Sequence, residues 1–417
     1  PTAIRFGQSD IAPQPKEMSL LGVDYLNITK ETKAIYHLFA RCINLEYVNG
    51  TNNWDISSID ALSTVFYECK SLKSIDVSSW DTSNVYTMYC TFARCISLES
   101  VDVSNWDTSR VNDMRLMFSD CPLLTELDLS NWDTSKVTVM QYMFSYCSAL
   151  KEINLSNWDT SKVSDMQYMF ARCYELNSII GIEDLDVSSV TSMDSMFFYS
   201  KVSELDLSNW KTDSLTNIDW MFCDCYMLRT LNVTGWNTSQ ITQMIETFAH
   251  YERGCHNLIE IIGLNTWDVS NVTSFEDFFW ECISLESLDL SGWNVRNVTY
   301  MGWMFCDCES LKELKLNDWH LNDNVSLSGM FSAYDYDGCP LLTSIEMTGS
   351  DYKSVNKIIS QLPTRTASNP GVLSIAGVDD ISKVDVATAE AKYWNITNEE
   401  NTCFILGKSK LGQDKLK

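Results

Sequence analysis

Tryptophan recurs at a fixed interval, and this interval is the strongest constraint on how the chain can fold. Trp54, Trp80, Trp106, Trp132 and Trp158 follow one another every 26 residues, and Trp210, Trp236, Trp267, Trp293 and Trp319 continue the series. A phenylalanine series keeps the same phase: Phe39, Phe66, Phe92, Phe118, Phe144, Phe170, Phe197, Phe222, Phe248, Phe279, Phe305 and Phe331. Two series in phase over about 300 residues predict stacked repeats rather than separate globular domains.

Each repeat combines two patterns of apolar residues. Leu127 and Leu129 alternate with Asp128 and Ser130, which is the period of a half-buried β-strand. The second half carries apolar residues at helical spacing, namely Val137, Met140, Met143, Phe144 and Cys147. We therefore expect an α/β solenoid, leucine-rich-repeat-like, of about twelve strand–helix units, with a parallel sheet on one face and helices on the other.

The repeated phrase LxxLDLSNWDTSKVxxMxxMFxxC resembles the BspA-like leucine-rich repeat family of bacterial, mycoplasmal and phage surface proteins. The resemblance covers about residues 30–345. The later segments IISQLPTRTASNPGVLSIAGV and VATAEAKYWNIT are similar to the C-terminal cap of such proteins. The expected organisation is an N-terminal cap or attachment segment at 1–30, the solenoid at 31–345 and a C-terminal cap at 346–417. The resemblance implies adhesion or receptor binding, and it carries over no catalytic residue and no cofactor.

The net charge of −26 limits the possible partners. A surface this acidic repels phosphate backbones and anionic lipids, so nucleic acid is not expected as a partner. No apolar stretch is long enough for a transmembrane helix, so direct membrane insertion is not expected either. The first residues lack a signal-peptide pattern, which is explained by a removed leader or by a clipped initiator Met. We expect the protein on a phage virion surface or on a bacterial cell surface.

Three further series consist of residues that can bind metals or sugars, but a structural role explains each of them better. Eleven cysteines occupy one repeat position, from Cys42 to Cys339, and we interpret them as buried thiols rather than zinc ligands or disulfides. The aspartates after tryptophan (Asp55, Asp81, Asp107, Asp133, Asp159 and Asp268) could form a calcium ladder, but helix caps and Asx-turns explain them better. The tryptophans could bind sugars, but their regularity favours a role in the framework.

The positions that vary between repeats point to a binding surface. In one repeat they are Gln141, Tyr142, Ser145 and Tyr146, which we expect to face outward from the helix. Two insertions, AHYERGC and SAYDYDGC, fall beside the same positions. Across the repeats these sites are rich in Tyr, Trp, Ser, Asp and Arg, a composition typical of antibody-like binding surfaces. The predicted binding residues are Tyr89, Arg94, Arg115, Tyr142, Tyr146, Tyr168, Arg172, Tyr199, Trp220, Tyr251, Trp280, Trp303, Tyr334 and Tyr336.

The sequence therefore favours a non-catalytic adhesin or receptor-binding protein whose variable helical ridge contacts a host-cell protein or glycan. One alternative is that the exposed aromatic residues only pack against neighbouring repeats or another domain. Another is a structural or decoration protein of a virion or bacterial surface. A polysaccharide-acting enzyme is a third reading, but the chain has four histidines, none paired with a recurrent Ser or Cys. No metal site is expected.

Overall fold

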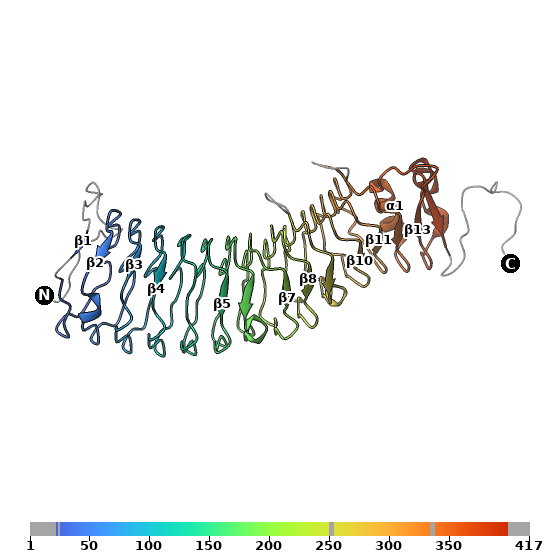
Figure 1. Cartoon of the computed structure of the whole chain (residues 1–417). Coiled ribbons are helices and arrows are strands. Elements are labelled where there is room, and N and C mark those ends of the chain that lie inside the picture. The colour runs from blue at the N-terminus through green and yellow to red at the C-terminus, as the bar shows by residue number, and fades with distance from the viewer. Residues whose placement is uncertain (1–21, 24–25, 250–253, 334–337, 399–417) are drawn as a thin grey trace, which may run out of the picture. The chain divides into compact units, whose positions relative to one another are not determined.

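The computed structural model describes residues 22–23, 26–249, 254–333 and 338–398. The chain divides into two compact units, Pro1–Leu215 and Thr216–Lys417, which are described separately. In each unit, short strands of successive repeats follow one another along the chain (Figure 1).

Unit 1 is a stack of short parallel strands. The strands are β1 (Gly22–Val23), β2 (Tyr47–Val48), β3 (Ser74–Ile75), β4 (Ser100–Val101), β5 (Glu152–Asn154), β6 (Ser178–Ile180) and β7 (Glu204–Asp206), with 3-10 turns η1 (Thr51–Asn53) and η2 (Ile182–Asp184). Parallel pairs join β1 to β2, β3 to β4 and β5 to β6. Ser74 pairs with Ser100 and Glu152 with Ser178, so the register equals the sequence repeat. The predicted parallel stacking is confirmed.

Unit 2 continues the same construction and adds helices. Its elements are β8 (Thr230–Asn232), β9 (Glu260–Ile262), η3 (Leu264–Thr266), β10 (Ser287–Asp289), β11 (Glu313–Lys315), β12 (Ser344–Glu346), α1 (Tyr352–Gln361), β13 (Gly371–Ser374), η4 (Ile381–Lys383), α2 (Val386–Ala391) and β14 (Trp394–Thr397). Strands β10 to β14 form one parallel sheet. Parallel stacking thus runs beyond residue 345, and the count of about twelve units is not confirmed.

The predicted helix in each repeat is wrong. In the described residues α-helices occur only as α1 and α2, and the stretch from Met140 to Cys147 consists of tight turns. Three of its amides close turns: Met143 N–H donates to Met140 O, Ser145 N–H to Tyr142 O, and Cys147 N–H to Phe144 O. The alternate amides bond to the next repeat, as when Phe144 N–H donates to Met169 O at 3.0 Å. An α-helix would keep these bonds within the segment, whereas here they hold one repeat to the next.

The buried ladders build the core. Phe92, Phe118 and Phe144 stack with ring centroids 5.7 and 6.1 Å apart, and Trp80 stacks on Trp106 at 6.0 Å. Trp132 is 2% exposed, and its indole N–H donates to the carbonyl of Val103 one repeat earlier at 3.1 Å. The other tryptophans of the series are buried as well, and a buried ring cannot receive a sugar, so the framework interpretation of the tryptophans is confirmed.

The cysteine and aspartate ladders are also structural. All described cysteines are free and buried, and Cys147 Sγ–H donates to the Phe118 carbonyl of the preceding repeat at 3.2 Å. Asp133 accepts the backbone N–H of Ser135 at 2.9 Å, which is an Asx-turn, and the same bond recurs at Asp159 and Asp107. The buried-thiol and Asx-turn interpretations are confirmed. The helix-cap interpretation of the aspartates is wrong, because no helix follows them.

Candidate functional site

The turns of each repeat hold two residues in the left-handed region. Their φ values lie between 51° and 62°, a region that side chains other than glycine rarely occupy. The first column is His37, Thr64, Cys90, Leu116, Tyr142, Tyr168 and Ser195 in unit 1, and Trp220, Glu246, Asp277 and Trp303 in unit 2. The second is Arg41, Glu68, Arg94, Asp120, Tyr146, Arg172 and Tyr199 in unit 1, and Asp224, Glu281 and Asp307 in unit 2. We call these columns, with the residue directly before each member, the turn ridge.

Glycine is the residue that this backbone favours, yet the ridge uses it sparingly. Gly254, Gly329 and Gly338 continue the columns, also with positive φ. At these positions a Cβ would be crowded; at Gly329 it would lie 2.9 Å from the Trp303 ring. Elsewhere the ridge keeps a side chain at a cost of roughly 1–2 kcal/mol per residue. Strain of this kind concentrates at functional sites, which makes the side chains of the turn ridge candidates for a functional role.

In unit 1 the predicted binding residues form contacts between adjacent repeats. Tyr142 and Tyr168 are half-buried and stack with centroids 4.5 Å apart and planes 5° apart. Burial, followed by the nearby Tyr168, raises the pKa of Tyr142 to about 12. Arg115 lies over the Tyr89 ring at 5.2 Å and pairs with Asp113 at 2.6 Å. Tyr146 is exposed.

Charged side chains from successive repeats form ion pairs at the start of the second column. Arg94 Nη1 lies 2.9 Å from Glu68 Oε1, and Arg41 Nε lies 3.6 Å from Glu68 Oε2. Burial of Glu68 opposes its ionisation, but hydrogen bonds from Arg94 and Tyr67 outweigh it, and the pKa of Glu68 is lowered. Sequence reasoning missed Glu68, although its place in the same column as Arg94 is visible in the repeat.

Several positions that we expected to face outward are buried. The third variable position of most repeats turns inward, as Ala93, Ser119, Ser145, Cys223 and Cys306 show. Tyr199, a predicted binding residue, is 1% exposed and packs edge to face on Phe198. The physical reason is the turn geometry. Consecutive tight turns point successive side chains in other directions than a helix does, so positions that a helix would expose are buried here. Tyr251, Tyr334 and Tyr336 lie outside the described residues.

The ridge of unit 2 is acidic around its tryptophans. Trp220, Trp280 and Trp303 are half-buried. Burial, then repulsion from Glu276, raises the pKa of Asp277 to about 7, and burial, then repulsion from Asp277, raises the pKa of Glu246 to about 7. These raised pKa values make the charge of the unit 2 ridge sensitive to pH near neutrality.

Two buried aspartates hold the chain where the insertions end. Asp224 Oδ1 accepts the N–H of Gly254 at 2.7 Å, and Asp307 Oδ1 accepts the N–H of Gly338 at 3.0 Å. Both occupy variable positions that we expected to face outward, yet they are buried, and the sequence carries a signal of their role. The phrase Trp-Met-Phe-Cys-Asp-Cys occurs twice, at 220–225 and 303–308, each time one repeat before an insertion.

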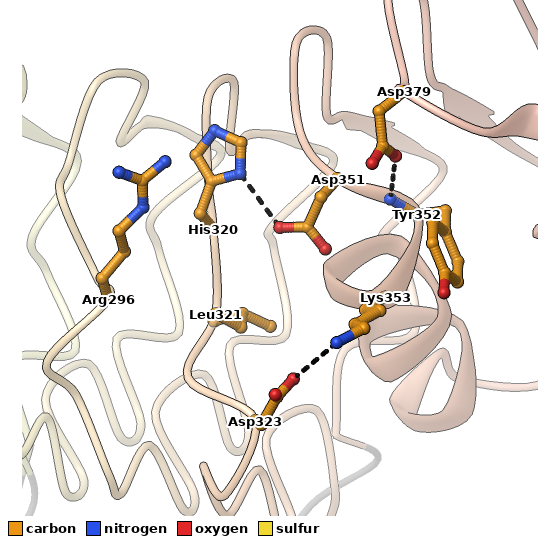
Figure 2. Close-up of a pocket in the computed structure, with 8 residues that line it drawn as sticks. All are labelled: Arg296, His320, Leu321, Asp323, Asp351, Tyr352, Lys353 and Asp379. Carbon is orange, nitrogen blue, oxygen red and sulfur yellow. Dashed lines mark hydrogen bonds and ion pairs between the residues drawn. The ribbon is translucent and has the colours of Figure 1, made fainter.

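A pocket of about 400 Å³ lies in unit 2 beside the start of α1 (Figure 2). Four of its charged side chains form two pairs: His320 Nδ1 lies 2.9 Å from Asp351 Oδ2, and Lys353 Nζ lies 3.3 Å from Asp323 Oδ1. Asp351 also accepts the N–H of Ser354 as the cap of α1. The pocket therefore lies at the junction between the last repeats and α1.

Within the residues that the structure describes, no group of three or more His, Cys, Asp or Glu side chains is placed to hold a metal ion. None of the helices described has both the length and the apolar character needed to cross a bilayer.

Fold and site together define the class, which is a leucine-rich-type repeat solenoid built from short parallel strands and tight turns. The family model described as "Mycoplasma protein of unknown function, DUF285" matches residues 33–153, 147–261 and 228–337. The chain therefore belongs to this family, and the resemblance to BspA-like leucine-rich repeat proteins is confirmed. No curated protein matches the chain.

Solved structures similar to the chain include bacterial repeat proteins. A leucine-rich repeat protein from Bacteroides ovatus shares 18% identity, with a TM-score of 0.42, over 81% of this chain and 92% of that one. One from Eubacterium ventriosum shares 16% identity, with a TM-score of 0.35, over 70% and 84%. A leucine-rich cell surface protein from Faecalibacterium prausnitzii shares 15% identity, with a TM-score of 0.27, over 83% and 87%.

Proposed function

We propose that the chain is a non-catalytic binding protein that presents the turn ridge to a host-cell protein or glycan. It acts as an adhesin or receptor-binding protein on a phage virion or a bacterial surface. The role in binding is what the BspA-like family implies, and the assignment to the ridge is our own.

One observation carries the proposal, which is the retention of side chains in strained backbone. A repeat that needed only to stack would place glycine in both columns, as the chain does at Gly254, Gly329 and Gly338. Instead the columns hold mostly Tyr, Trp, Arg, Asp and Glu, and the residue type varies from repeat to repeat. Aromatic residues and arginine supply much of the binding energy in protein interfaces.

The experiment compares two surfaces of one chain. Tyr142→Gly, Tyr146→Gly and Tyr168→Gly together remove ridge side chains while leaving a residue that suits the left-handed backbone. The matched control replaces Glu126, Glu152 and Glu204, exposed on the strand side, with Ser. Labelled full chain is applied to a panel of bacterial and mammalian cells and to a glycan array.

We expect the ridge variant to lose at least tenfold in binding to whichever target the wild type recognises, and the strand-side variant to keep it. Circular dichroism and a melting curve verify that both variants are folded. Loss of binding in the strand-side variant alone would move the site to the sheet. No target for the wild type, together with co-purification in an assembled particle, would favour the decoration role.

A further inference from the structure

Arg172 sits in an aromatic enclosure on the ridge of unit 1. Its guanidinium carbon lies 5.2 Å from the Tyr146 centroid, 5.0 Å from that of Phe198 and 5.1 Å from that of Tyr199. Its Nη1 donates to the hydroxyl of Tyr174 at 3.3 Å. These contacts come from the repeats on either side and hold the planar group in place.

The charge of Arg172 is not neutralised as that of the other ridge arginines is. Arg41 and Arg94 share Glu68, and Arg115 has Asp113. Within the described ranges, no carboxylate lies within 4.0 Å of a nitrogen of Arg172. Glu175, close by in sequence, pairs instead with Lys201 at 2.8 Å. Among the described residues, Arg110, Arg229, Arg296 and Arg365 also have no carboxylate within 4.0 Å, and Arg172 differs from them in being held over aromatic rings.

We propose that Arg172 is the anion-recognition point of the turn ridge and that it binds an Asp or Glu carboxylate of a partner protein. The inference rests on the proposed function and specifies the chemistry of the partner. A guanidinium presents paired N–H donors that match a carboxylate, and rings that fix its plane reduce the entropy lost on binding.

The surrounding rings favour a polypeptide over an acidic sugar. A sugar stacks on an open aromatic face, but Tyr142 and Tyr168 turn a face toward each other at 4.5 Å. One face of Tyr146 is covered by Arg172, and Phe198 and Tyr199 are buried. Ring faces used in this way are less available to a sugar, whereas ring edges, hydroxyls and the guanidinium suit peptide groups and acidic side chains.

The matched control is provided by the sequence itself. Arg94 and Arg172 both occur in the phrase Phe-Ala-Arg-Cys, at the same position of the same column. Only their partners differ, so Arg94→Gln removes the same charge from the same backbone without touching the aromatic enclosure. Arg172→Lys keeps the charge but loses the planar fork, and it serves as the second test variant.

The probe is a displayed library of random twelve-residue peptides, selected on immobilised full chain of wild type, Arg172→Gln, Arg172→Lys and Arg94→Gln. We expect Asp and Glu to be enriched at least threefold in peptides from wild type and from Arg94→Gln, and not from Arg172→Gln. The strongest acidic peptide should bind wild type at least tenfold more tightly than its amide version, with Arg172→Lys in between. Melting curves establish that each variant is folded.

Peptides without acidic enrichment on wild type, or with equal enrichment on Arg172→Gln, would overturn the inference. Binding of sialyllactose or oligogalacturonate that depends on Arg172, with no acidic peptide selected, would also overturn it in favour of a glycan. If the ridge variant loses its cell target while Arg172→Gln keeps it, the inference fails and the proposed function stands. If both variants keep the target, both proposals fail.

Discussion

A glycine substitution in the turn ridge distinguishes tight turns from a helix, because the two structures predict opposite effects on the free energy of unfolding when glycine is compared with alanine. Leu116 has φ 54° and is half-buried. Leu116→Ala and Leu116→Gly both remove the leucine side chain beyond Cβ, so the comparison between them isolates the effect of the Cβ atom on the backbone.

The expected difference follows from the left-handed conformation. A Cβ there costs roughly 1–2 kcal/mol, and the greater freedom of glycine in the unfolded chain offsets roughly 0.5–1 kcal/mol of that. Leu116→Gly should therefore be more stable than Leu116→Ala by about 0.5–1 kcal/mol. In a helix interior the order is reversed, with Ala more stable by about 1 kcal/mol.

Urea denaturation of the full chain, monitored by circular dichroism, measures the difference in the free energy of unfolding. It is obtained from the shift in the urea midpoint between the two variants when both have the same denaturant slope. Asn112 is the control, since it lies exposed in the same repeat with an ordinary φ. There we expect Ala to be the more stable of the two substitutions. If Leu116→Ala exceeded Leu116→Gly by about 1 kcal/mol, the reasoning about the turns would be refuted.

Three further predictions concern the framework and the acidic ridge. Thr134→Val should cost about 1 kcal/mol, because it removes the bond from Thr134 Oγ1 to Asp159 O at 3.0 Å, and a matched Thr134→Ser should cost less; equal losses by denaturation would contradict this. Burial raises the pKa of the Cys147 thiol well above its usual range, so Ellman's reagent at pH 8 should react far faster with unfolded than with native chain; rapid labelling of native chain would count against a buried ladder. Asp277 and Glu246 have folded pKa values of about 7, above their unfolded values, so the folded state binds their protons more tightly. Lowering the pH from 8 to 6 should therefore raise the melting temperature, and Asp277→Asn should flatten this rise; an unchanged profile in that variant would show that the carboxyl is not responsible.

The ladders could be predicted from sequence because one residue type repeats at one position. A tryptophan or cysteine that recurs every 26 residues must meet the same neighbours in each repeat, and burial is the simplest environment that suits them all. Trp132 and Cys147 are buried for this reason, and the parallel register follows from the same interval.

A helix in each repeat could not be excluded from the sequence, because a series of tight turns gives the same spacing of apolar residues. Met140, Met143, Phe144 and Cys147 have helical spacing, but successive three-residue turns bury the same residues. The choice depends on where the alternate amides find acceptors, and these acceptors lie in the next repeat. For the same reason Tyr199 and Ser145 were predicted to be exposed and are buried.

The three arginines of the Phe-Ala-Arg-Cys phrase, Arg41, Arg94 and Arg172, show what each level decides. The sequence by itself determined that they occupy one repeat position and that this position varies. Only the tertiary structure decided that two of them meet Glu68 and the third meets Tyr146, Phe198 and Tyr199. The physical reason is that each ridge side chain is surrounded by residues about 26 positions away, so its charge state and availability are set by the neighbouring repeats.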